Sequence, residues 1–426
     1  QAGRILGQSV KTHKRMNERE LFRLALGLAS PWQVKSLEFS GEKQRLDITL
    51  DFAKGSRFSC PVCGKVCGVH DTENRTWRHL NFFQHETYLH ARQPRVNCSE
   101  HKVKTVEVPW ARPGAGFTLL FEALVMVLLK NGMTPSATGR MVGEYDTLIW
   151  RILDHYVGEA REGLDLSEVT QVGMDETSRA KGHQYVTVFM DMEERRIVFA
   201  TEGKDAETVK AFKADLQEHG GEAGQVREFC ADMSPAFQSG IEAEFPQARI
   251  TFDPFHLMKM MNEAVDEVRR EEQKQHPELK GSKYLWLKNE WNHTQRQKEL
   301  FDSLRTLDLK TKKAHHLKGV FQDIYACSPQ EGEALLKRWY YWATHSRLQP
   351  IVEFAKTVKR HWDGVVRWFQ TKISNGLLEG MNSLIQAAKA RSRGFRNVKN
   401  FITMIYLIGA KLEFHLPAVL PPAHTK

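Results

Sequence analysis

Two groups of residues in this sequence have types and spacings that bind metal ions. The first is a set of cysteines: Cys60-Pro-Val-Cys63 is followed by Cys98-Ser-Glu-His101. Two knuckles of the form C-x-x-ligand close a tetrahedral zinc site, and four protein ligands leave no open position for catalysis. We therefore expect one structural Zn²⁺, held by these four side chains in a zinc finger. Two alternatives stay open: Cys67 in place of His101, or free thiols with a surface histidine.

The second group consists of carboxylates. Asp175 follows the apolar strand pattern VTQVGM, and Asp232 follows the pattern VREFCA. Strand ends are where sheet-based folds place ligand groups. Glu379 lies on a predicted helix, opposite a predicted buried face of Leu377, Leu378, Met381, Leu384 and Ile385. Three carboxylates brought together repel one another unless they share cations, and oxygen ligands suit Mg²⁺ or Mn²⁺. Spacing alone does not single out Glu379.

Several nearby polar residues allow two interpretations. Glu176 either supports the carboxylate site or is simply exposed. His256, in Asp253-Pro-Phe-His256, contacts the site or DNA, or caps a helix. Asp191 ends a strand before the charged turn EERR, which favours a solvated hairpin. A basic run is either a solvated face or a contact for the DNA backbone; it consists of Lys389, Arg391, Arg393 and Arg396.

The elements that would position the carboxylates follow a βββαβαβα order. This order predicts a mixed sheet covered by helices. Residues 262–370 lose the strand pattern, are rich in Lys, Arg and His, and hold six of the ten tryptophans, which indicates a helical insertion. Two further helices follow at 376–391 and 398–411. The predicted strands are 169–174, 185–190, 196–201, 226–231 and 248–252, with helices at 206–218, at 235–245 and from 256.

The N-terminal region contains the cysteines and the segments around them. A short amphipathic helix around Leu21 and Leu24 precedes a pair of alternating strands joined around Gly41. After the cysteines, Pro109–Gly116 is rich in Pro and Gly and is interpreted as a linker. This region therefore forms a strand-rich domain that ends before residue 117.

A helical segment at 117–157 follows the linker. Thr134 is a good N-cap for its second helix, and Gly143 ends that helix before a third one begins at Asp146. A short helix, a glycine turn and a second helix with Arg151 exposed form a helix-turn-helix pattern, which places a helix in the DNA major groove. The alternative is an ordinary three-helix bundle.

The composition agrees with a globular protein that binds a polyanion. Hydrophobic residues make up 41% of the 426 residues, which excludes a disordered chain, and 61 Lys and Arg against 52 Asp and Glu favour nucleic acid as partner. The apolar runs are too short to span a bilayer. We see no signal peptide and expect a cytoplasmic, bacterial protein that is nucleoid-associated when bound to DNA. Because Met16 opens a more natural beginning, residues 1–15 are interpreted as upstream or appended sequence.

These residues together resemble the ISL3 (ISL-three) family of insertion-sequence transposases. The resemblance runs from about Met16 to the C-terminus, and it departs from the family at His101, where the second knuckle usually ends in cysteine. It rests on the knuckles, the helix-turn-helix and four blocks: GMDETS around Asp175, ADMSPAF around Asp232, DPFHLMK around His256, and SNGLLEGMNSLIQAAKARSRGFRN around Glu379.

The resemblance implies an α/β fold: an RNase H-like mixed sheet with a helical insertion, preceded by a zinc finger and a helix-turn-helix domain. It implies that Asp175, Asp232 and Glu379 form a DDE triad that binds two Mg²⁺ (or Mn²⁺), with Glu176, His256 and Asn382 as supporting residues. The expected domains are 16–108 (zinc finger), 117–160 (helix-turn-helix), 168–261 with 371–412 (catalytic), and 262–370 (insertion).

We expect a DNA transposase that binds the terminal inverted repeats of its element. It would cleave the DNA and transfer the strand to a target by two-metal phosphoryl transfer. Arg151 and the basic run after Glu379 are the expected DNA contacts. Because two DNA ends must be paired, a homo-oligomer is expected. The alternative function is a non-catalytic DNA-binding regulator derived from a transposase; a zinc hydrolase is disfavoured because the zinc site is closed.

Overall fold

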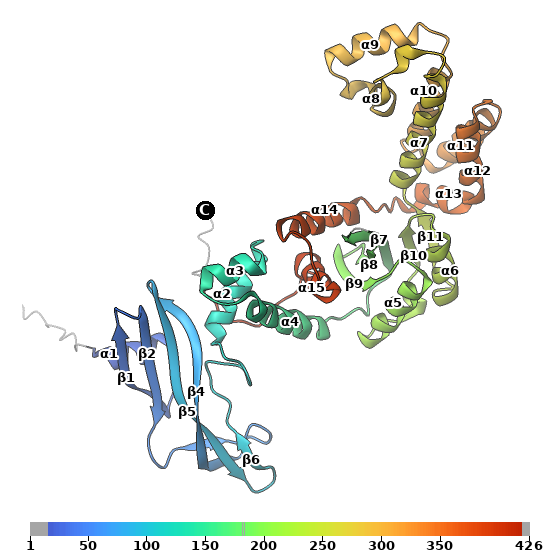
Figure 1. Ribbon diagram of the computed structural model, residues 1–426. Coiled ribbons are helices and arrows are strands. Elements are labelled where there is room, and N and C mark those ends of the chain that lie inside the picture. Colours follow the sequence, from blue (N-terminus) through green and yellow to red (C-terminus); the bar gives the residue numbers. More distant parts are fainter. Residues whose placement is uncertain (1–15, 181, 183, 420–426) are drawn as a thin grey trace, which may run out of the picture. The chain divides into compact units, whose positions relative to one another are not determined.

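The computed structural model describes residues 16–180, 182 and 184–419, and these form two compact units (Figure 1). One unit comprises residues 16–152 with 414–419, and the other comprises 153–413. Residues 1–15, interpreted above as upstream or appended sequence, lie outside the described residues. Among the described residues, no helix is both long and apolar enough to cross a lipid bilayer.

The first unit is built on a six-stranded sheet in the order β1-β2-β5-β4-β3, with β6 paired to β5. The predicted helix is α1 (Glu18–Ala25), and the predicted hairpin is the antiparallel pair β1–β2. Leu46, Ile48 and Leu50 alternate along β2 and are 3% exposed or less, which is the period of a half-buried strand. The strands are β1 (Trp32–Ser40), β2 (Arg45–Phe52), β3 (Arg57–Ser59), β4 (Val66–Phe82), β5 (His85–Cys98) and β6 (Lys102–Thr105).

The segment Pro109–Gly116 contains no helix or strand, but the prediction of a linker is wrong because the segment packs against the sheet. Trp110 is buried, and its ring contacts those of Trp32 and Trp77 at centroid distances of 4.8 and 5.6 Å. Its carbonyl also accepts a 2.8 Å hydrogen bond from the backbone of Leu119. The burial of a large aromatic ring fixes this segment to the sheet, an effect that its Pro and Gly content does not reveal.

Three helices follow as predicted: α2 (Leu119–Lys130), α3 (Pro135–Val142) and α4 (Asp146–Glu162), which runs five residues past the predicted end. The Thr134 hydroxyl accepts a hydrogen bond from Ala137 N at the start of α3. Gly143 ends α3 with φ +77°. A Cβ on Gly139 would lie 2.6 Å from the carbonyl oxygen of Glu144, so α3 and the turn approach closely only because glycine stands there.

The second unit contains a five-stranded mixed sheet in the order β11-β10-β7-β8-β9. The first three strands along the chain, β7, β8 and β9, pair antiparallel, whereas β10 runs parallel to β7 and β11 parallel to β10. This is the predicted mixed sheet. The strands are β7 (Gln171–Ala180), β8 (Gln184–Asp191), β9 (Arg196–Glu202), β10 (Glu228–Ala231) and β11 (Arg249–Phe252).

Helices cover both faces of this sheet (Figure 1). On one side lie α5 (Ala206–Glu218) and α6 (Pro235–Glu244), where the ring of Phe212 packs against those of Phe189 and Phe245. On the other lie α14 (Gly376–Arg391) and α15 (Val398–Gly409), both predicted. The hydroxyl of Tyr406 accepts a hydrogen bond from Ala200 N, which joins α15 to β9.

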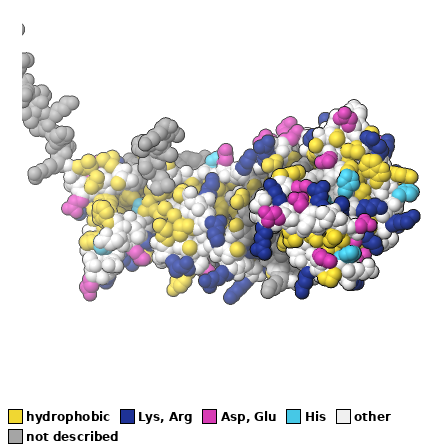
Figure 2. Space-filling model, turned by 90° about the horizontal axis from the view of Figure 1, so that it is seen from above, with side chains coloured by type: hydrophobic (Ala, Val, Ile, Leu, Met, Phe, Trp, Pro, Cys, Tyr) yellow, Lys and Arg dark blue, Asp and Glu magenta, His cyan; other side chains and the backbone are white. Residues whose placement is uncertain are grey.

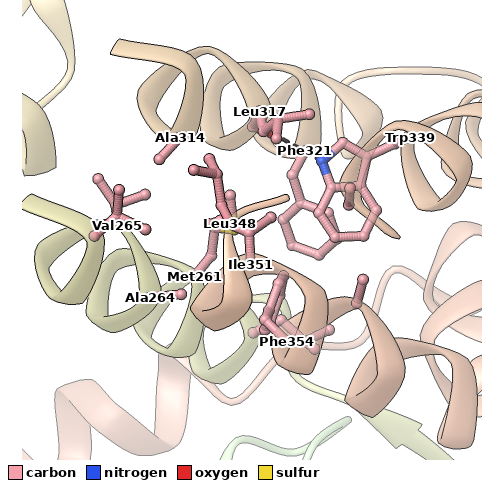
Figure 3. Packing of buried hydrophobic residues seen from close by; sticks show 14 of the residues in the cluster. Met261, Ala264, Val265, Ala314, Leu317, Phe321, Trp339, Leu348, Ile351 and Phe354 are labelled. Carbon is pink, nitrogen blue, oxygen red and sulfur yellow. Dashed lines mark hydrogen bonds between the residues drawn. The ribbon is translucent and has the colours of Figure 1, made fainter. Parts of the chain in front are cut away.

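The predicted insertion is helical, and no strand lies among residues 253–413, all of which the structure describes. Its core contains Trp286, Phe321, Trp339 and Phe354, all at most 4% exposed. Figure 3 shows Phe321, Trp339 and Phe354 packed against one another. Gly364 lies so close to Phe252 of β11 that a Cβ there would be 2.4 Å from the Phe252 ring, and this contact seats the insertion on the sheet. The helices are α7 (Pro254–Glu272), α8 (Lys283–Leu287), α9 (Gln295–Arg305), α10 (Lys310–Ile324), α11 (Pro329–Thr344), α12 (Gln349–Arg360) and α13 (Trp362–Thr371).

Candidate active site and zinc site

The four predicted zinc ligands lie together at one edge of the first sheet. Ligand atoms of Cys60, Cys63, Cys98 and His101 are all within 4.8 Å of one another. Cys63 Sγ is 3.7 Å from Cys98 Sγ, and His101 Nδ1 is 3.7 Å from Cys98 Sγ and 4.0 Å from Cys60 Sγ. Ligands about 2.0–2.3 Å from a tetrahedral zinc are separated by ~3.4–3.8 Å, so the arrangement fits this ion.

Local structure brings the two knuckles together. Cys60 follows β3, and a turn with Gly64 at φ +72° returns the chain so that Gly64 N bonds to the Cys60 carbonyl. Cys98 is the last residue of β5, where backbone N–H groups of Glu100 and His101 lower the pKa of its thiol to about 6. Cys67 is not part of this cluster, and its thiol donates to the Lys65 carbonyl instead.

The structure places Asp175 differently from the prediction. Asp175 lies inside β7 rather than at its end, because β7 continues to pair with β8 beyond Gly173, the last residue of β7 that is paired with β10. Polar residues after Met174 hid this continuation in the sequence. Asp175 still lies two residues after the end of the parallel pairing between β7 and β10. Asp232 directly follows β10, the neighbouring strand.

Hydrogen bonds hold both aspartates in place. Asp175 Oδ1 accepts from Glu176 N at 2.8 Å, and Asp175 Oδ2 accepts from the side-chain amide of Asn382 at 2.9 Å. Asp232 Oδ1 accepts from Ser234 N at 2.9 Å, in the turn that leads to α6. Each carboxylate therefore has a fixed direction, which a metal-binding site requires of its ligands.

Glu379 reaches this region from the first turn of α14. Polar side chains about two and three turns further along α14 attach the helix to β7: Gln386 donates to the Thr177 hydroxyl at 2.7 Å, and Lys389 donates to the Ser178 carbonyl. With Asn382, they form a polar stripe that faces the strand. The predicted buried face is wrong in two members, because Leu377 and Leu384 are 45% and 57% exposed, whereas Leu378 and Ile385 are buried.

Two residues that the sequence ranked as weak candidates stand beside Glu379. Asp253, His256 and Glu379 each offer a ligand atom within 4.8 Å of the others, and His256 Nε2 is 3.9 Å from Glu379 Oε1. Asp175 and Asp232 are not part of this compact cluster. Asp253 directly follows β11 and caps α7 by accepting from Phe255 N, so its position after a strand carried the same signal as that of Asp232.

The carboxylates of the site are desolvated and repel one another. Burial raises the pKa of Asp175, of Asp253 and of Glu379, and like charges add to the rise: Asp232 acts on Asp175, and Asp253 acts on Glu379. Asp253 Oδ2 and Glu379 Oε1 are buried and have no hydrogen-bond partner among the described residues. Such oxygens are costly unless a cation binds them, so the donor set fits divalent metal ions.

The remaining predicted supporting residues differ in outcome. Asn382 contacts Asp175 directly, as described above. Glu176 is half-buried. Burial raises the pKa of its carboxyl, and repulsion from Asp232 adds to the rise.

The solvated hairpin predicted for Asp191 is wrong. Asp191 is 3% exposed, and its carboxylate accepts hydrogen bonds from the backbone N–H groups of Glu193 and Glu194 in the charged turn.

An open cleft of about 830 Å³ runs along Asp232 and His256. Its lining includes Thr357 and Arg360 of α12, in the insertion, and Lys259 of α7. The insertion therefore contributes side chains to the cleft. The volume is within the range of pockets that bind small ligands.

The predicted DNA contacts are mostly exposed. Arg151 on α4 and Arg391, Arg393 and Arg396 after Glu379 are exposed, whereas Lys389 is half-buried against Ser178. Figure 2 shows Lys and Arg side chains interspersed with acidic ones on the face in view. The structure thus leaves these arginines accessible in their own units.

Comparison with known proteins identifies the class. Residues 172–405 match a family model described as a transposase, residues 106–157 match the helix-turn-helix domain of transposase family ISL3, and residues 56–101 match the zinc finger of the transposases of IS204, IS1001, IS1096 and IS1165. The molecule is a DNA-binding transposase, and the segment predicted as a helix-turn-helix, 117–157, is confirmed as one. This chain belongs to the ISL3 family of transposases.

Relatives cover the same length. The transposase for insertion sequence element IS1557 of Mycobacterium tuberculosis is 27% identical over 96% of this chain and 98% of its own. The transposase for insertion sequence element IS1001 of Bordetella parapertussis is 26% identical over 81% and 87%. A simian T-cell lymphotropic virus intasome bound to a PP2A regulatory subunit overlaps 36% of this chain and 59% of its own at 16% identity and a TM-score of 0.18, which is too low to establish a shared fold.

Proposed function

We propose that this transposase is catalytically competent, and that Asp175, Asp232 and Glu379 are its catalytic carboxylates. It binds the terminal inverted repeats of its insertion sequence, cleaves the DNA there and joins the strand to a target. One observation carries the proposal: four carboxylates gather beside one cleft, on β7, directly after β10 and β11, and on α14. Burial raises the pKa of three of them, Asp175, Asp253 and Glu379, and two of their oxygens have no hydrogen-bond partner among the described residues. A protein that only bound DNA would gain nothing from this arrangement.

We assign the catalytic domain to the RNase H-like class. The strand order β11-β10-β7-β8-β9, with three antiparallel strands followed by two parallel ones, supports this assignment. So does the position of Asp175 on the central strand and of Asp232 after its parallel neighbour. We keep the predicted domain boundaries, in which residues 168–261 and 371–412 form this domain and 262–370 form the insertion.

The site fits divalent cations, Mg²⁺ or Mn²⁺, as ligands of the carboxylates. Bound there, two such ions stabilise the attacking and leaving oxygens of an in-line phosphoryl displacement. Asp253 and His256 adjoin Glu379 and extend the ligand set on that side. Asn382 keeps the Asp175 carboxylate oriented, and Lys259 and Arg360 line the cleft where they meet the negative phosphate backbone.

We assign one structural zinc to Cys60, Cys63, Cys98 and His101. The set supplies four ligands, so it leaves no position for a reacting water and does not support a zinc hydrolase. The zinc finger and the helix-turn-helix, with Arg151 on α4, would recognise the element ends. Because two ends must be paired, we propose that the protein acts as a homo-oligomer.

A paired assay tests the function. Gel shift and Mg²⁺-dependent nicking are measured on duplexes carrying the element ends, for the wild type and for Asp175→Asn, Asp232→Asn and Glu379→Gln. Each near-isosteric change removes an anionic ligand, so nicking and strand transfer should be lost while end binding stays intact. The control Glu207→Gln removes an exposed charge on α5 and should cut normally.

Two outcomes would contradict the proposal. A wild-type protein that binds the ends but never nicks them is a non-catalytic regulator. Normal cutting by Glu379→Gln together with a dead Asp253→Asn or Glu176→Gln would leave a transposase with a different set of catalytic residues.

A further inference from the structure

A second open pocket lies on the insertion side of α7, next to the proposed active site. It has a volume of about 640 Å³ and lies between one stripe of α7, from Phe255 to Arg270, and Lys283 and Leu287 of α8. The α7 residues recur at helical spacing, so they form one continuous wall: Phe255, Met258, Lys259, Asn262, Glu263, Asp266 and Arg270.

The pocket adjoins the catalytic cleft. Lys259 and Glu263 line both spaces. Phe255 is the neighbour of His256, which lies in the cluster with Glu379. A strand whose reacting phosphate lies in the cleft can therefore place an adjacent nucleotide in this pocket.

One side of the pocket is apolar and contains an aromatic ring. Phe255 is 56% exposed although it lies two residues after the buried N-cap Asp253. Met258 and Leu287 extend the apolar wall. A solvent-exposed phenylalanine beside a phosphodiester site is a stacking platform for a base, because every base has a π-face.

The other side carries an excess of positive charge and an amide oxygen without a partner. Three cations, Lys259, Arg270 and Lys283, and two carboxylates, Glu263 and Asp266, line the pocket. Asp266 forms ion pairs with Arg269 at 2.8 Å, Lys283 at 3.5 Å and Arg270 at 3.6 Å. Arg270 and Lys283 are 63% and 47% exposed and so available to a phosphate. Asn262 Oδ1 is buried without a hydrogen-bond partner among the described residues, which suits the amino group of a base edge.

We propose that this pocket binds an unpaired nucleotide of the DNA strand next to the cleavage site, with its base on Phe255 and its phosphate on Arg270 and Lys283. The inference rests on the proposed function for its substrate. The combination of a stacking ring, a polar atom for the base edge and a basic rim favours a nucleotide over an apolar protein segment, and the pocket is of the size that small ligands occupy.

Photocrosslinking tests the stacking contact. A 12-nucleotide oligothymidylate with one 5-iodouracil is bound to the full-length protein in Ca²⁺ and irradiated, and the crosslinked peptide is identified by mass spectrometry. The crosslink should fall on Phe255, disappear in Phe255→Ala and persist in Phe255→Trp. The matched control is Tyr284→Ala: Tyr284 is 61% exposed on α8 but does not line the pocket, so its loss should leave the crosslink unchanged.

Binding measurements test the energetics and the basic rim. Phe255→Ala should weaken binding of the same oligonucleotide roughly 5- to 150-fold, the range for loss of one stacked base. Arg270→Ala with Lys283→Ala should lower the slope of log K against log salt by about 1–2. Lys337→Ala, an exposed lysine on α11, is the charge control and should have no comparable effect.

The outcomes distinguish this inference from the proposed function. A crosslink and affinity unchanged in Phe255→Ala overturn the pocket assignment even if Asp232→Asn abolishes nicking. The pocket assignment would also be overturned if Phe255→Ala changed the molar mass of the protein in solution and kept the crosslink. That result would show that Phe255 contacts a second copy of the chain.

Discussion

The side-chain amide of Asn382 donates a 2.9 Å hydrogen bond to Oδ2 of Asp175. The two residues are 207 positions apart in the sequence, and this bond joins α14 to β7 at the centre of the proposed active site. It fixes the direction of the Asp175 carboxylate. It also fixes the rotation of α14, and with it the position of Glu379 one turn before Asn382.

The first prediction follows from this bond. Asn382→Ala should reduce nicking about 10- to 100-fold, the usual loss when a residue that orients a metal ligand is removed, and should leave end binding unchanged. As a positioning residue, Asn382 should also change the metal requirement, so the variant should need a higher Mg²⁺ concentration for half-maximal rate. Ser383→Ala on the exposed neighbouring position is the control. An unchanged Mg²⁺ dependence would contradict the role.

The second prediction concerns Asp253 and His256. Asp253→Asn should bind fewer Mn²⁺ ions per chain than the wild type, measured by electron paramagnetic resonance of free Mn²⁺, because it removes an anionic ligand beside Glu379. His256→Gln should weaken Mn²⁺ binding more than Mg²⁺ binding, since imidazole suits the transition metal better than it suits Mg²⁺. Equal stoichiometry and affinity in all three proteins would place both residues outside the metal site.

The third prediction concerns zinc. The purified protein should contain about one Zn²⁺ per chain, and Cys63→Ser should lose the metal, destabilise the N-terminal domain and weaken end binding, because structural zinc contributes folding free energy directly. Cys67→Ser is the matched control, since Cys67 lies outside the ligand cluster and should retain the metal. Metal analysis decides this; folded wild-type protein free of zinc would rule the assignment out.

The fourth prediction concerns DNA recognition. Arg151→Ala should weaken binding to the element ends. If Arg151 contacts a guanine, the loss is roughly 1–3 kcal/mol and specificity relaxes at one base pair. If it contacts phosphate, binding falls evenly across sequences and the salt slope decreases by about one. Gel shifts at several salt concentrations separate the two cases, and equal affinity of variant and wild type would show that α4 does not enter the groove.

The fifth prediction concerns pH and the first unit. Burial lowers the pKa of His79 from 6.5 to about 4, with Arg78 adding to the effect, and His79 Nδ1 lies 2.8 Å from the Thr118 hydroxyl. As the pH falls, His79 therefore becomes protonated in the unfolded state before it does in the folded state. Stability is full above pH 6.5 and decreases as the pH falls towards 4, by about 1 kcal/mol between pH 7.5 and 5.5.

His79→Asn tests this effect, because the amide can replace Nδ1 without titrating. Urea unfolding of the variant should depend less on pH between 7.5 and 5.5 than that of the wild type. His70→Asn, a change at an exposed histidine on the same strand, should retain the wild-type dependence. A His79→Asn variant with the full wild-type dependence would assign the effect to other groups.

Patterns local in the sequence predicted most elements of the structure. The alternation of Leu46, Ile48 and Leu50 gave a strand, the Thr134 cap and Gly143 bounded α3, and the helix α14 was placed at its observed residues. The four zinc ligands were also found this way. Each of these signals depends on contacts within a few residues, or on a ligand spacing that one metal ion imposes.

The errors share another cause. Asp175 was placed after its strand, Asp191 in solvent, Leu384 in the core and Pro109–Gly116 in a linker, and each error concerns a partner far away in the chain. Pairing with β8 extends β7 past Asp175, and the rings of Trp32 and Trp77 bury Trp110. A polar or exposed-looking pattern cannot show such partners, because burial depends on what packs from another element.

Local motifs are enough to predict the family, the Cys60–Cys63 and Cys98–His101 knuckles and the two aspartates. The folded chain alone shows that Asp253 and His256 lie beside Glu379, that Asn382 bonds to Asp175, and that α12 lines the cleft. This is because a carboxylate site that binds metal needs charges from several elements to converge. Convergence is set by how α14 and the insertion pack on the sheet, and no spacing along the chain records it.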